Sequence, residues 1–435
     1  MKYFKNMIYW DKINSTEQKK IISRPFLKNN NFIKKIVTEI IENVKNLGDE
    51  ALKKYTILFD KYDLNVFQIP KKQIFSSSSF LNKDLKNSIE IAKKNITLFH
   101  EAQISSTIDI ETEIGVRCQQ INLPLNRIGI YIPGGTAPLF STVLMLAIPA
   151  KIAGCKEIVL CSPPPVSNEI LYTAHVCGID NIFQVGGAQA IAALSFGTET
   201  IPKVDKIFGP GNAYVTEAKL QVSSSFNGTA IDMLAGPSEL LIIADDTANP
   251  DFIAADLLSQ AEHGMSSQVI LLTPYIELAQ KVIFSLNIQL NKLSRLSEML
   301  TALKNSTIII TKNLSECIKI SNMYAPEHLI IQTKSPREVL NYISNASSIF
   351  LGLWSPESAG DYASGTNHVL PTYGKSIANS SLGLADFQKR ILVQELTTQG
   401  LITLSNTLEI LSSAEKLEAH KNAVRIRVDF LKEKI

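Results

Sequence analysis

Apolar residues recur at helical spacing in the first third of the chain. A second amphipathic run, residues 83–103, follows a serine-rich turn at residues 76–79. Between residues 32 and 60, Gly48 followed by Asp49 indicates that one helix stops and another begins. The apolar face of the helix before that break contains Ile33, Ile36, Val37, Ile40, Ile41 and Val44. We therefore expect the chain to begin with helices.

From residue 128 onward, short apolar runs end in turn residues and alternate with helix-like segments. Such alternation is typical of βαβ units and parallel sheets. Nine strands are many for one doubly wound sheet, so we expect two α/β domains that meet near Ser238. The tail, residues 405–435, is again helical and charged. The nine expected strands are residues 128–133, 157–163, 181–187, 206–211, 239–245, 268–273, 307–311, 328–333 and 348–352.

Composition excludes several classes of protein. The 435 residues are 45% hydrophobic, with 43 basic and 41 acidic side chains and a net charge of +2. This length can fill two or three domains, and the hydrophobic fraction is too high for disorder. The balanced charge gives no electrostatic reason to expect nucleic acid or a membrane surface as partner.

The termini and cysteines indicate a compartment. The first 20 residues contain no apolar stretch of signal-peptide length, and the most apolar run, 139–150, is far shorter than the ~20 residues of a membrane span. Five cysteines, an odd number without CxxC spacing, argue against a disulfide framework. We therefore expect a cytoplasmic protein.

Three glycine-bearing turns end expected strands and precede helix-like runs: residues 131–135 (YIPGG), 185–189 (VGGAQ) and 208–212 (FGPGN). Glycine lets a ligand approach the main chain, and a helix N-terminus adds partial positive charge. Neither GxGxxG nor the P-loop pattern occurs, which excludes the standard nucleotide motifs. The turns are either simple βα connections or, taken together, a site for an extended anionic cofactor.

One further pattern carries candidate metal ligands. Gln260 and His263, spaced i and i+3, share a helix face and offer an oxygen and a nitrogen to a metal. The alternative is a solvated or hydrogen-bonded histidine. His420 lies in the tail helix, and Asp361 lies in residues 354–371, which we expect to be a long functional loop.

Residues 324–328 (YAPEH) place an acid and an imidazole before an apolar strand. An imidazole with a pKa near 6.5 can take a proton from an alcohol, and a neighbouring carboxylate can activate water. In the alternative interpretation, Glu327 belongs to a simple turn and His328 caps the strand. No GxSxG occurs and no cysteine lies beside a histidine, so a nucleophilic hydrolase has no candidate. The role of His368 stays open.

Eight ordered segments together resemble the histidinol dehydrogenase family, and the resemblance covers essentially the whole chain. The segments are residues 131–145, 185–196, 204–214, 231–239, 256–264, 324–329, 358–372 and 415–423. The resemblance implies two Rossmann-like parallel-sheet domains with small helical extensions, as in aldehyde dehydrogenases. The implied division is an N-terminal extension (1–25), a substrate and zinc domain (26–129 and 237–381), an NAD domain (130–236) and a C-terminal helical extension (382–435).

The resemblance also implies an activity of bacterial histidine biosynthesis. The family oxidises L-histidinol through L-histidinaldehyde to L-histidine, using two NAD in succession and one zinc per site. His420 would come from the partner subunit, which implies a homodimer with shared sites. By resemblance, His328 is the base and Glu327 activates water. The implied zinc ligands are Gln260, His263, Asp361 and His420; the NAD contacts are Tyr131, Gln189 and Asn212; the substrate contacts are Ser238, His328, Glu415 and the four zinc ligands.

Two alternatives remain at this stage. One is a zinc-assisted dehydrogenase or hydrolase that acts on a different amino alcohol, which the choice of substrate would reveal. The other is a catalytically silent relative with a binding or regulatory role, which turnover would exclude.

Overall fold

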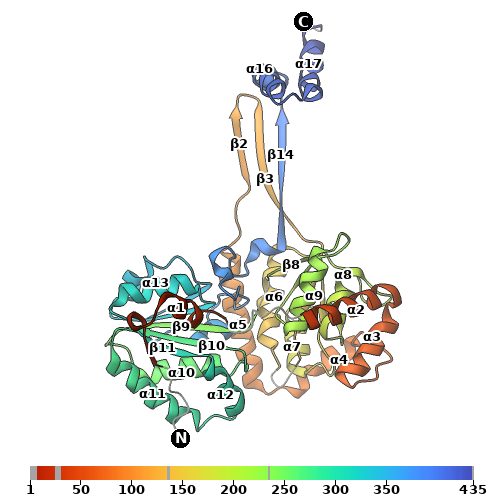
Figure 1. Cartoon of the computed structure of the whole chain (residues 1–435). Helices are drawn as coiled ribbons and strands as arrows, with labels where there is room; N and C mark the ends of the chain where they lie inside the picture. Colours follow the sequence, from red (N-terminus) through yellow and green to blue (C-terminus); the bar gives the residue numbers. More distant parts are fainter. Residues whose placement is uncertain (1–6, 25–30, 135–137, 234–235, 434–435) are drawn as a thin grey trace.

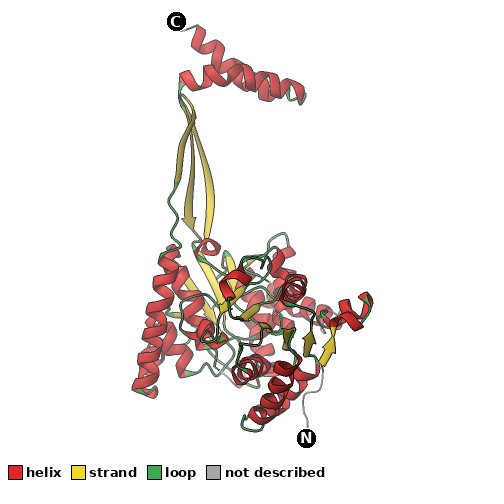
Figure 2. Ribbon diagram, turned by 90° about the vertical axis from the view of Figure 1, so that its left-hand side faces the viewer, coloured by secondary structure: helices red, strands yellow, loops and turns green. Residues whose placement is uncertain are grey.

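The structure is a computed structural model that describes residues 7–24, 31–134, 138–233 and 236–433. Two lobes lie side by side, each built around a parallel sheet, and a long stalk projects away from them (Figure 1). Figure 2, turned by 90°, shows the same stalk carrying a pair of helices at its far end. No helix within these ranges is both long and apolar enough to cross a membrane.

The first lobe contains a five-stranded sheet in the order β6-β5-β4-β7-β8, with all pairs parallel. One helix connects each strand to the next, as the alternating pattern predicts. The strands are β4 (Arg127–Tyr131), β5 (Glu157–Cys161), β6 (Asn181–Phe183), β7 (Lys206–Phe208) and β8 (Ala230–Ile231). The helices are α6 (Phe140–Ala153), α7 (Asn168–Val176), α8 (Gly187–Phe196) and α9 (Ala213–Ser224).

The early helices pack on this same lobe. They are α2 (Asn31–Leu47), α3 (Asp49–Tyr55), α4 (Lys71–Ser76) and α5 (Lys83–Glu101), and Gly48 breaks α2 from α3 at a φ of 52°. The apolar face of α2 contacts α8 and α9, and α5 contacts α6. This packing differs from the expectation that residues 26–129 belong with residues 237–381, because an apolar face does not specify which sheet it covers. The rest of the division into domains stays a prediction, and its edge at residues 25–26 lies outside the described residues.

The second lobe contains a six-stranded parallel sheet in the order β1-β11-β10-β9-β12-β13. The N-terminal extension contributes β1, which pairs with β11 at the sheet's edge, and α1 (Ser15–Ile21). The strands are β1 (Met7–Tyr9), β9 (Glu239–Ala244), β10 (Gln268–Thr273), β11 (Thr307–Ile310), β12 (His328–Gln332) and β13 (Ser348–Leu351). The helices are α10 (Pro250–Ala261), α11 (Ile276–Leu290), α12 (Leu296–Lys304), α13 (Leu314–Tyr324), α14 (Pro336–Leu340) and α15 (Glu357–Tyr362).

The two sheets share one topology. Apart from β1, the first strand of each sheet in chain order lies in the middle. The next two strands are added on one side of it and the last two on the other side. The chain therefore reverses direction between β4 and β7 in one sheet and between β9 and β12 in the other, where α/β sheets open a crevice. All nine expected strands are present, and the fold class of two parallel-sheet units with extensions is confirmed.

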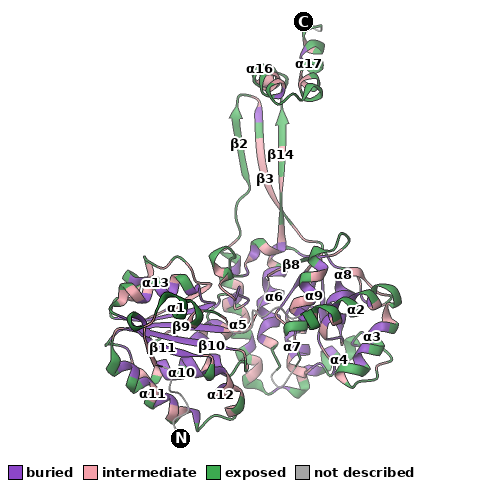
Figure 3. Cartoon of the chain, viewed as in Figure 1, coloured by how far each residue is buried: buried purple, intermediate pink, exposed green. Residues whose placement is uncertain are grey.

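The stalk was not predicted. It is an antiparallel sheet of β2 (Ile108–Glu113), β3 (Val116–Pro124) and β14 (Gln388–Leu396), followed by α16 (Thr398–Ala414) and α17 (Glu418–Lys432). The predicted C-terminal helical extension from residue 382 is present as α16 and α17, but a strand that was not expected, β14, comes before these helices. Every residue of β2 is exposed, and Figure 3 shows the contrast between this strand in the stalk and the buried strands inside the lobes. A strand without a buried face lacks the alternating pattern by which sequences reveal strands.

Candidate active site

Glu327 and His328 lie where the second lobe's central strands begin. His328 is the first residue of β12 and pairs with Leu240 of β9 and Ser348 of β13. Glu327 precedes it, and its carbonyl accepts a hydrogen bond from the Ser348 N–H at 2.9 Å. Both side chains are buried, at 7% and 5% exposure. The pair therefore lies at the amino ends of these strands.

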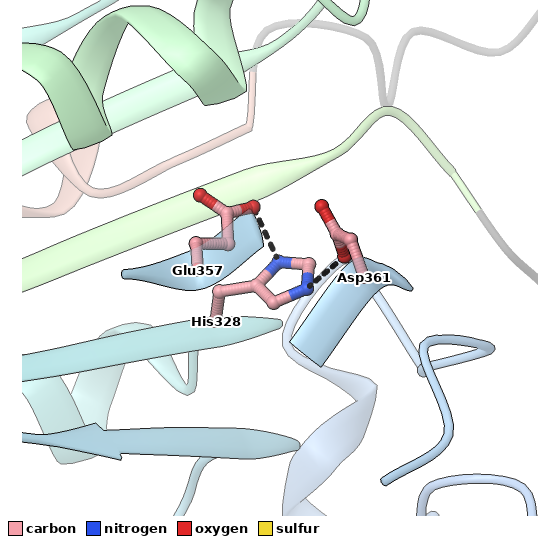
Figure 4. A group of neighbouring side chains, drawn as sticks. All are labelled: His328, Glu357 and Asp361. Carbon is pink, nitrogen blue, oxygen red and sulfur yellow. Dashed lines mark ion pairs between the residues drawn. The ribbon is translucent and has the colours of Figure 1, made fainter. Parts of the chain in front are cut away.

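Two acidic side chains from α15 lie on either side of the His328 ring (Figure 4). Glu357 Oε1 is 3.4 Å from Nδ1, and Asp361 Oδ1 is 3.8 Å from Nε2. Glu327 Oε2 is 3.6 Å from Nδ1. The expected loop at residues 354–371 therefore contains a helix, whose Glu357 and Asp361, four residues apart, face the same ring.

Burial changes the proton affinities of this cluster. It lowers the pKa of His328 to about 3 and raises that of Asp361 to about 6. Burial likewise raises the pKa values of Glu327 and Glu357 well above the ordinary range, and the neighbouring carboxyl groups add to the effect. A group of acids in such surroundings favours a bound cation, which would stabilise their charged forms.

Two of the predicted zinc ligands reach this cluster from the end of α10. Gln260 is fully buried beside Glu357 and Glu239; with its amide group turned over, its nitrogen can donate to the Glu357 carboxylate and its oxygen lies 3.0 Å from the Glu239 nitrogen. His263 is more open, and its Nε2 is 4.0 Å from Asp361 Oδ2. Gln260, His263 and Asp361 thus come together. Ser238 precedes Glu239 at the same edge of the sheet.

His368 connects the acid cluster to the other lobe. Its Nδ1 is 2.7 Å from the Asp361 carbonyl oxygen, and its Nε2 is 3.2 Å from Thr142 Oγ1 on α6. Burial lowers the pKa of His368 to about 4, so the ring is neutral and donates through one nitrogen and accepts through the other. His368 therefore connects α15 with the beginning of the helix that follows β4.

The three predicted NAD contacts line one cavity of about 770 Å³ at the carboxyl ends of the first lobe's strands. Tyr131 ends β4, and its hydroxyl accepts from the Gly187 N–H at 3.0 Å. Gln189 lies in the first turn of α8, and Asn212 caps α9. The glycine turns thus meet at one crevice, although Gly135 of the first turn lies outside the described residues.

Several polar atoms in this cavity have no partner. Within the described part of the chain, neither polar side-chain atom of Gln189 makes a hydrogen bond, although the residue is only 1% exposed. Asp60, from the π-helical turn Thr56–Asp60, also lines the cavity with an unpartnered Oδ2. Buried polar atoms are ordinarily paired, so these atoms are suited to form hydrogen bonds with a polar ligand in the cavity. No sequence pattern singled out Asp60.

A buried ion pair fixes the third glycine turn. Lys219 of α9 pairs with Asp232, and both side chains are at most 3% exposed. Lys219 Nζ donates to the Gly209 carbonyl at 2.8 Å, and Asp232 accepts from the Gly209 N–H at 2.8 Å. Gly209 has a φ of 116°, and a Cβ there would meet the Tyr131 carbonyl. Only glycine fits this turn without displacing β4.

A family model described as histidinol dehydrogenase matches residues 23–428. The chain belongs to the histidinol dehydrogenase family. The histidinol dehydrogenase of Buchnera aphidicola subsp. Acyrthosiphon pisum (strain APS) is 80% identical over all of both chains, and that of Escherichia coli (strain K12) is 56% identical over 99% of each. The crystal structure of histidinol dehydrogenase from Elizabethkingia anophelis matches with a TM-score of 0.95 at 46% identity, covering 99% of each chain.

Two residues that the histidinol dehydrogenase resemblance assigns to the site lie away from it within this chain. Glu415 follows α16 and His420 lies in the first turn of α17, at the far end of the stalk (Figure 1). Both are exposed. Conversely, sequence reasoning missed Glu357, which together with His328 and Asp361 forms a group able to hold a metal. Glu357 lies four residues before Asp361. This spacing places both on one helix face, but it is informative only when residues 357–362 are known to be helical.

Proposed function

We propose that this chain oxidises L-histidinol through the aldehyde to L-histidine, with NAD as the hydride acceptor in both steps. The observation that carries the proposal is the buried Glu327–His328 pair, which combines an imidazole base with a carboxylate beside a candidate metal site. Removal of a hydride from a carbinol carbon requires a base for the hydroxyl proton, and the aldehyde must add water before a second hydride can leave.

The geometry supports His328 Nε2 as the base. Nδ1 lies 3.2 Å from the Glu239 carbonyl oxygen, an acceptor that fixes the proton on Nδ1 and leaves the lone pair on Nε2. The lowered pKa keeps the ring neutral and able to accept. Nε2 lies on the side of the ring that faces Asp361, and a substrate hydroxyl that reached it would give its proton to the imidazole.

Glu327 is suited to activate water for the second step. Its Oε2 accepts from the Glu239 N–H at 2.7 Å, which orients the carboxylate and leaves Oε1 for a water molecule. Burial raises its pKa, and a carboxylate in such surroundings is a stronger base than one in water. Glu327 would take the proton from water as the oxygen adds to the aldehyde carbon.

The first lobe's cavity supports a dinucleotide. The unpartnered amide of Gln189 suits the polar groups of a cofactor, and the unpartnered Asp60 carboxylate can accept from ribose hydroxyls. The N–H groups that begin α8 suit a pyrophosphate. When bound, NAD supplies the acceptor for the hydride. Tyr131 and Asn212, on the cavity wall, would position it.

The donor set near Asp361 suits zinc. Imidazole nitrogen with carboxylate and amide oxygens is a known combination for Zn²⁺, and the buried carboxyl groups favour a cation. We propose Gln260, His263 and Asp361 of one chain and His420 of the second as the ligands. This set leaves His328 free as the base, whereas a metal held by His328, Glu357 and Asp361 would occupy it. Zinc, when bound, would orient the amine and imidazole of the substrate.

The stalk supports a homodimer with shared sites. Its helices bury almost nothing: Gly400 and Ser412 are the buried residues of α16, and Val428 is that of α17. Large apolar side chains along it are exposed, namely Ile108, Ile110, Leu392, Ile402, Ile410, Leu411, Ile426 and Phe430. An apolar surface of this extent requires a covering partner. A second copy would receive His420 and Glu415 at its own site.

The test is turnover with product identification. The purified protein, given L-histidinol and NAD, should release L-histidine, detected by mass spectrometry. His328→Asn should lower the rate at least a hundredfold, while His175→Asn, a change on α7 remote from the site, should leave it within twofold. Oxidation of other amino alcohols at rates equal to histidinol would contradict the substrate assignment.

A further inference from the structure

Arg24, at the end of the N-terminal extension, forms a bidentate ion pair with Glu239 at the beginning of β9. Arg24 Nε donates to Glu239 Oε1 at 2.9 Å, and Nη2 donates to Oε2 at 2.9 Å. The side chains are 10% and 2% exposed. The guanidinium also lies over the Tyr324 ring, 3.8 Å from its centroid. Such a fork fixes the carboxylate in both position and orientation.

Glu239 in turn contacts both proposed catalytic residues through its main chain. Its N–H donates to Glu327 Oε2 at 2.7 Å, and its carbonyl accepts from His328 Nδ1 at 3.2 Å. A displacement of Glu239 would therefore rotate the carboxylate of Glu327. It would also remove the hydrogen-bond acceptor that keeps the proton of His328 on Nδ1.

The same guanidinium binds the turn that leads into the catalytic pair. Arg24 Nη2 donates to the carbonyl oxygens of Tyr324 at 2.6 Å and Ala325 at 3.3 Å. Ala325 has a φ of 51°, a left-handed conformation that a residue with a Cβ adopts only when its surroundings impose it. Tyr373, with a φ of 56°, donates its N–H to Glu239 Oε1 at 3.0 Å. The ion pair thus holds two left-handed residues in place.

We propose that Arg24 is a positioning residue for the reaction: through Glu239 and the turn at Ala325 it sets where Glu327 and His328 lie. This inference rests on the proposed roles of those two residues. Arg24 does not line the proposed NAD cavity, so its loss should lower kcat without weakening cofactor binding. Misplacement of a catalytic group by about 1 Å can cost 10²-fold in rate. We therefore expect Arg24→Gln to lower kcat by about 10–100-fold.

The test compares Arg24→Gln, Arg24→Lys and Glu239→Gln with the control Arg127→Gln. Arg127 pairs with Glu157 between β4 and β5, so its loss removes an ion pair away from the catalytic residues. We expect Arg24→Gln and Glu239→Gln to lose kcat for both histidinol and histidinaldehyde. KM for histidinol, the Kd of NADH by fluorescence and the zinc content should stay within threefold of wild type. Arg24→Lys, which keeps the charge without the fork, should recover part of kcat.

Two results would overturn the inference: a kcat of folded Arg24→Gln within twofold of wild type, or an equal loss in Arg127→Gln. If Arg24→Gln does not fold, Arg24→Lys decides, because an unchanged kcat contradicts positioning. A wild-type protein that makes no NADH from histidinol would instead refute the proposed function. Hydrogen exchange would then test the positioning: Arg24→Lys should accelerate exchange in residues 324–330 and not in residues 185–196, and unchanged exchange in residues 324–330 would contradict it.

Discussion

His328 owes its chemistry to its neighbours. Burial keeps the ring neutral, and the Glu239 carbonyl oxygen accepts a hydrogen bond from Nδ1–H. Asp361 lies beside Nε2, which carries the lone pair. A histidine in water would be partly charged near pH 6.5 and free to exchange tautomers. The surroundings thus keep His328 in the neutral form that the proposed role of base requires.

The proposed roles of Glu327 and His328 predict different losses in the two half-reactions. Glu327→Gln keeps the hydrogen bond from Glu239 but cannot take a proton from water. Oxidation of histidinol to the aldehyde should therefore stay within about tenfold of wild type, while oxidation of added aldehyde should fall by about 10²–10⁴-fold. His328→Asn should damage both. Single-turnover NADH formation from each substrate measures the two steps separately. Equal rates on both substrates for Glu327→Gln would contradict the role of Glu327.

Asp256 on α10 predicts a pH dependence of stability. It is 7% exposed, and burial raises its pKa to about 7 from an ordinary value near 3.8. The folded state therefore binds more protons than the unfolded state between about pH 4 and 7. The free energy of unfolding falls as pH rises through that window, by up to about 4 kcal/mol.

Asp256→Asn should remove this loss. Gln332 Nε2 donates to Asp256 at 3.3 Å, and an asparagine oxygen can accept the same bond. We expect the variant to gain stability relative to wild type as pH rises from 5 to 8, measured by urea unfolding of zinc-free protein. The exposed Asp246→Asn serves as control. A constant difference between variant and wild type across this range would show that Asp256 does not titrate there.

At the residue scale, motifs revealed the residues whose chemistry is distinctive and missed those defined by their surroundings. Glu327 and His328 are adjacent in sequence and carry recognisable chemistry. Glu357, Asp60 and Arg24 are ordinary charged residues whose importance lies in contacts with distant segments. No single-sequence pattern records a contact between residues 24 and 239.

At the scale of elements, the turn between β7 and α9 predicts a defect in cofactor binding. Gly209→Ala places a Cβ against the Tyr131 carbonyl at a φ of 116°. We expect the Kd of NADH to rise at least tenfold, measured by fluorescence titration, because β4 and the turn both line the cavity. Gly154→Ala, also left-handed with a φ of 92° but at the end of α6, is the matched control. An equal rise in both variants would assign the effect to general strain.

Elements with a buried face were predictable and the stalk was not. The nine predicted strands of the two sheets are apolar runs because helices cover them, and α2 shows its helical period because one face is buried. β2 and β14 are largely exposed within one chain, so their residues follow no burial pattern. A second chain that covers these strands, as proposed, would explain why they carry apolar side chains.

At the scale of the whole molecule, the proposed shared sites predict complementation between inactive subunits. His420→Asn should weaken zinc binding, and His328→Asn should abolish turnover. In a mixed dimer, one site contains both defects and the other contains neither. Random mixing makes half of the dimers hybrid, so refolding an equal mixture should restore about one quarter of wild-type activity. Mass spectrometry of intact dimers measures the hybrid fraction.

Two outcomes would contradict this arrangement. No recovery at a confirmed hybrid fraction would mean that His420 acts within its own chain or not at all. Full zinc content in the His420→Asn homodimer would remove this residue from the ligand set.

The most direct test of the account is the number of NADH molecules formed per L-histidinol consumed. The purified protein should form two, form none after a chelator has removed the metal, and form two again when zinc is restored. One NADH per histidinol would contradict the second oxidation and the role of Glu327. No NADH from folded, zinc-loaded dimer would contradict the proposed function itself.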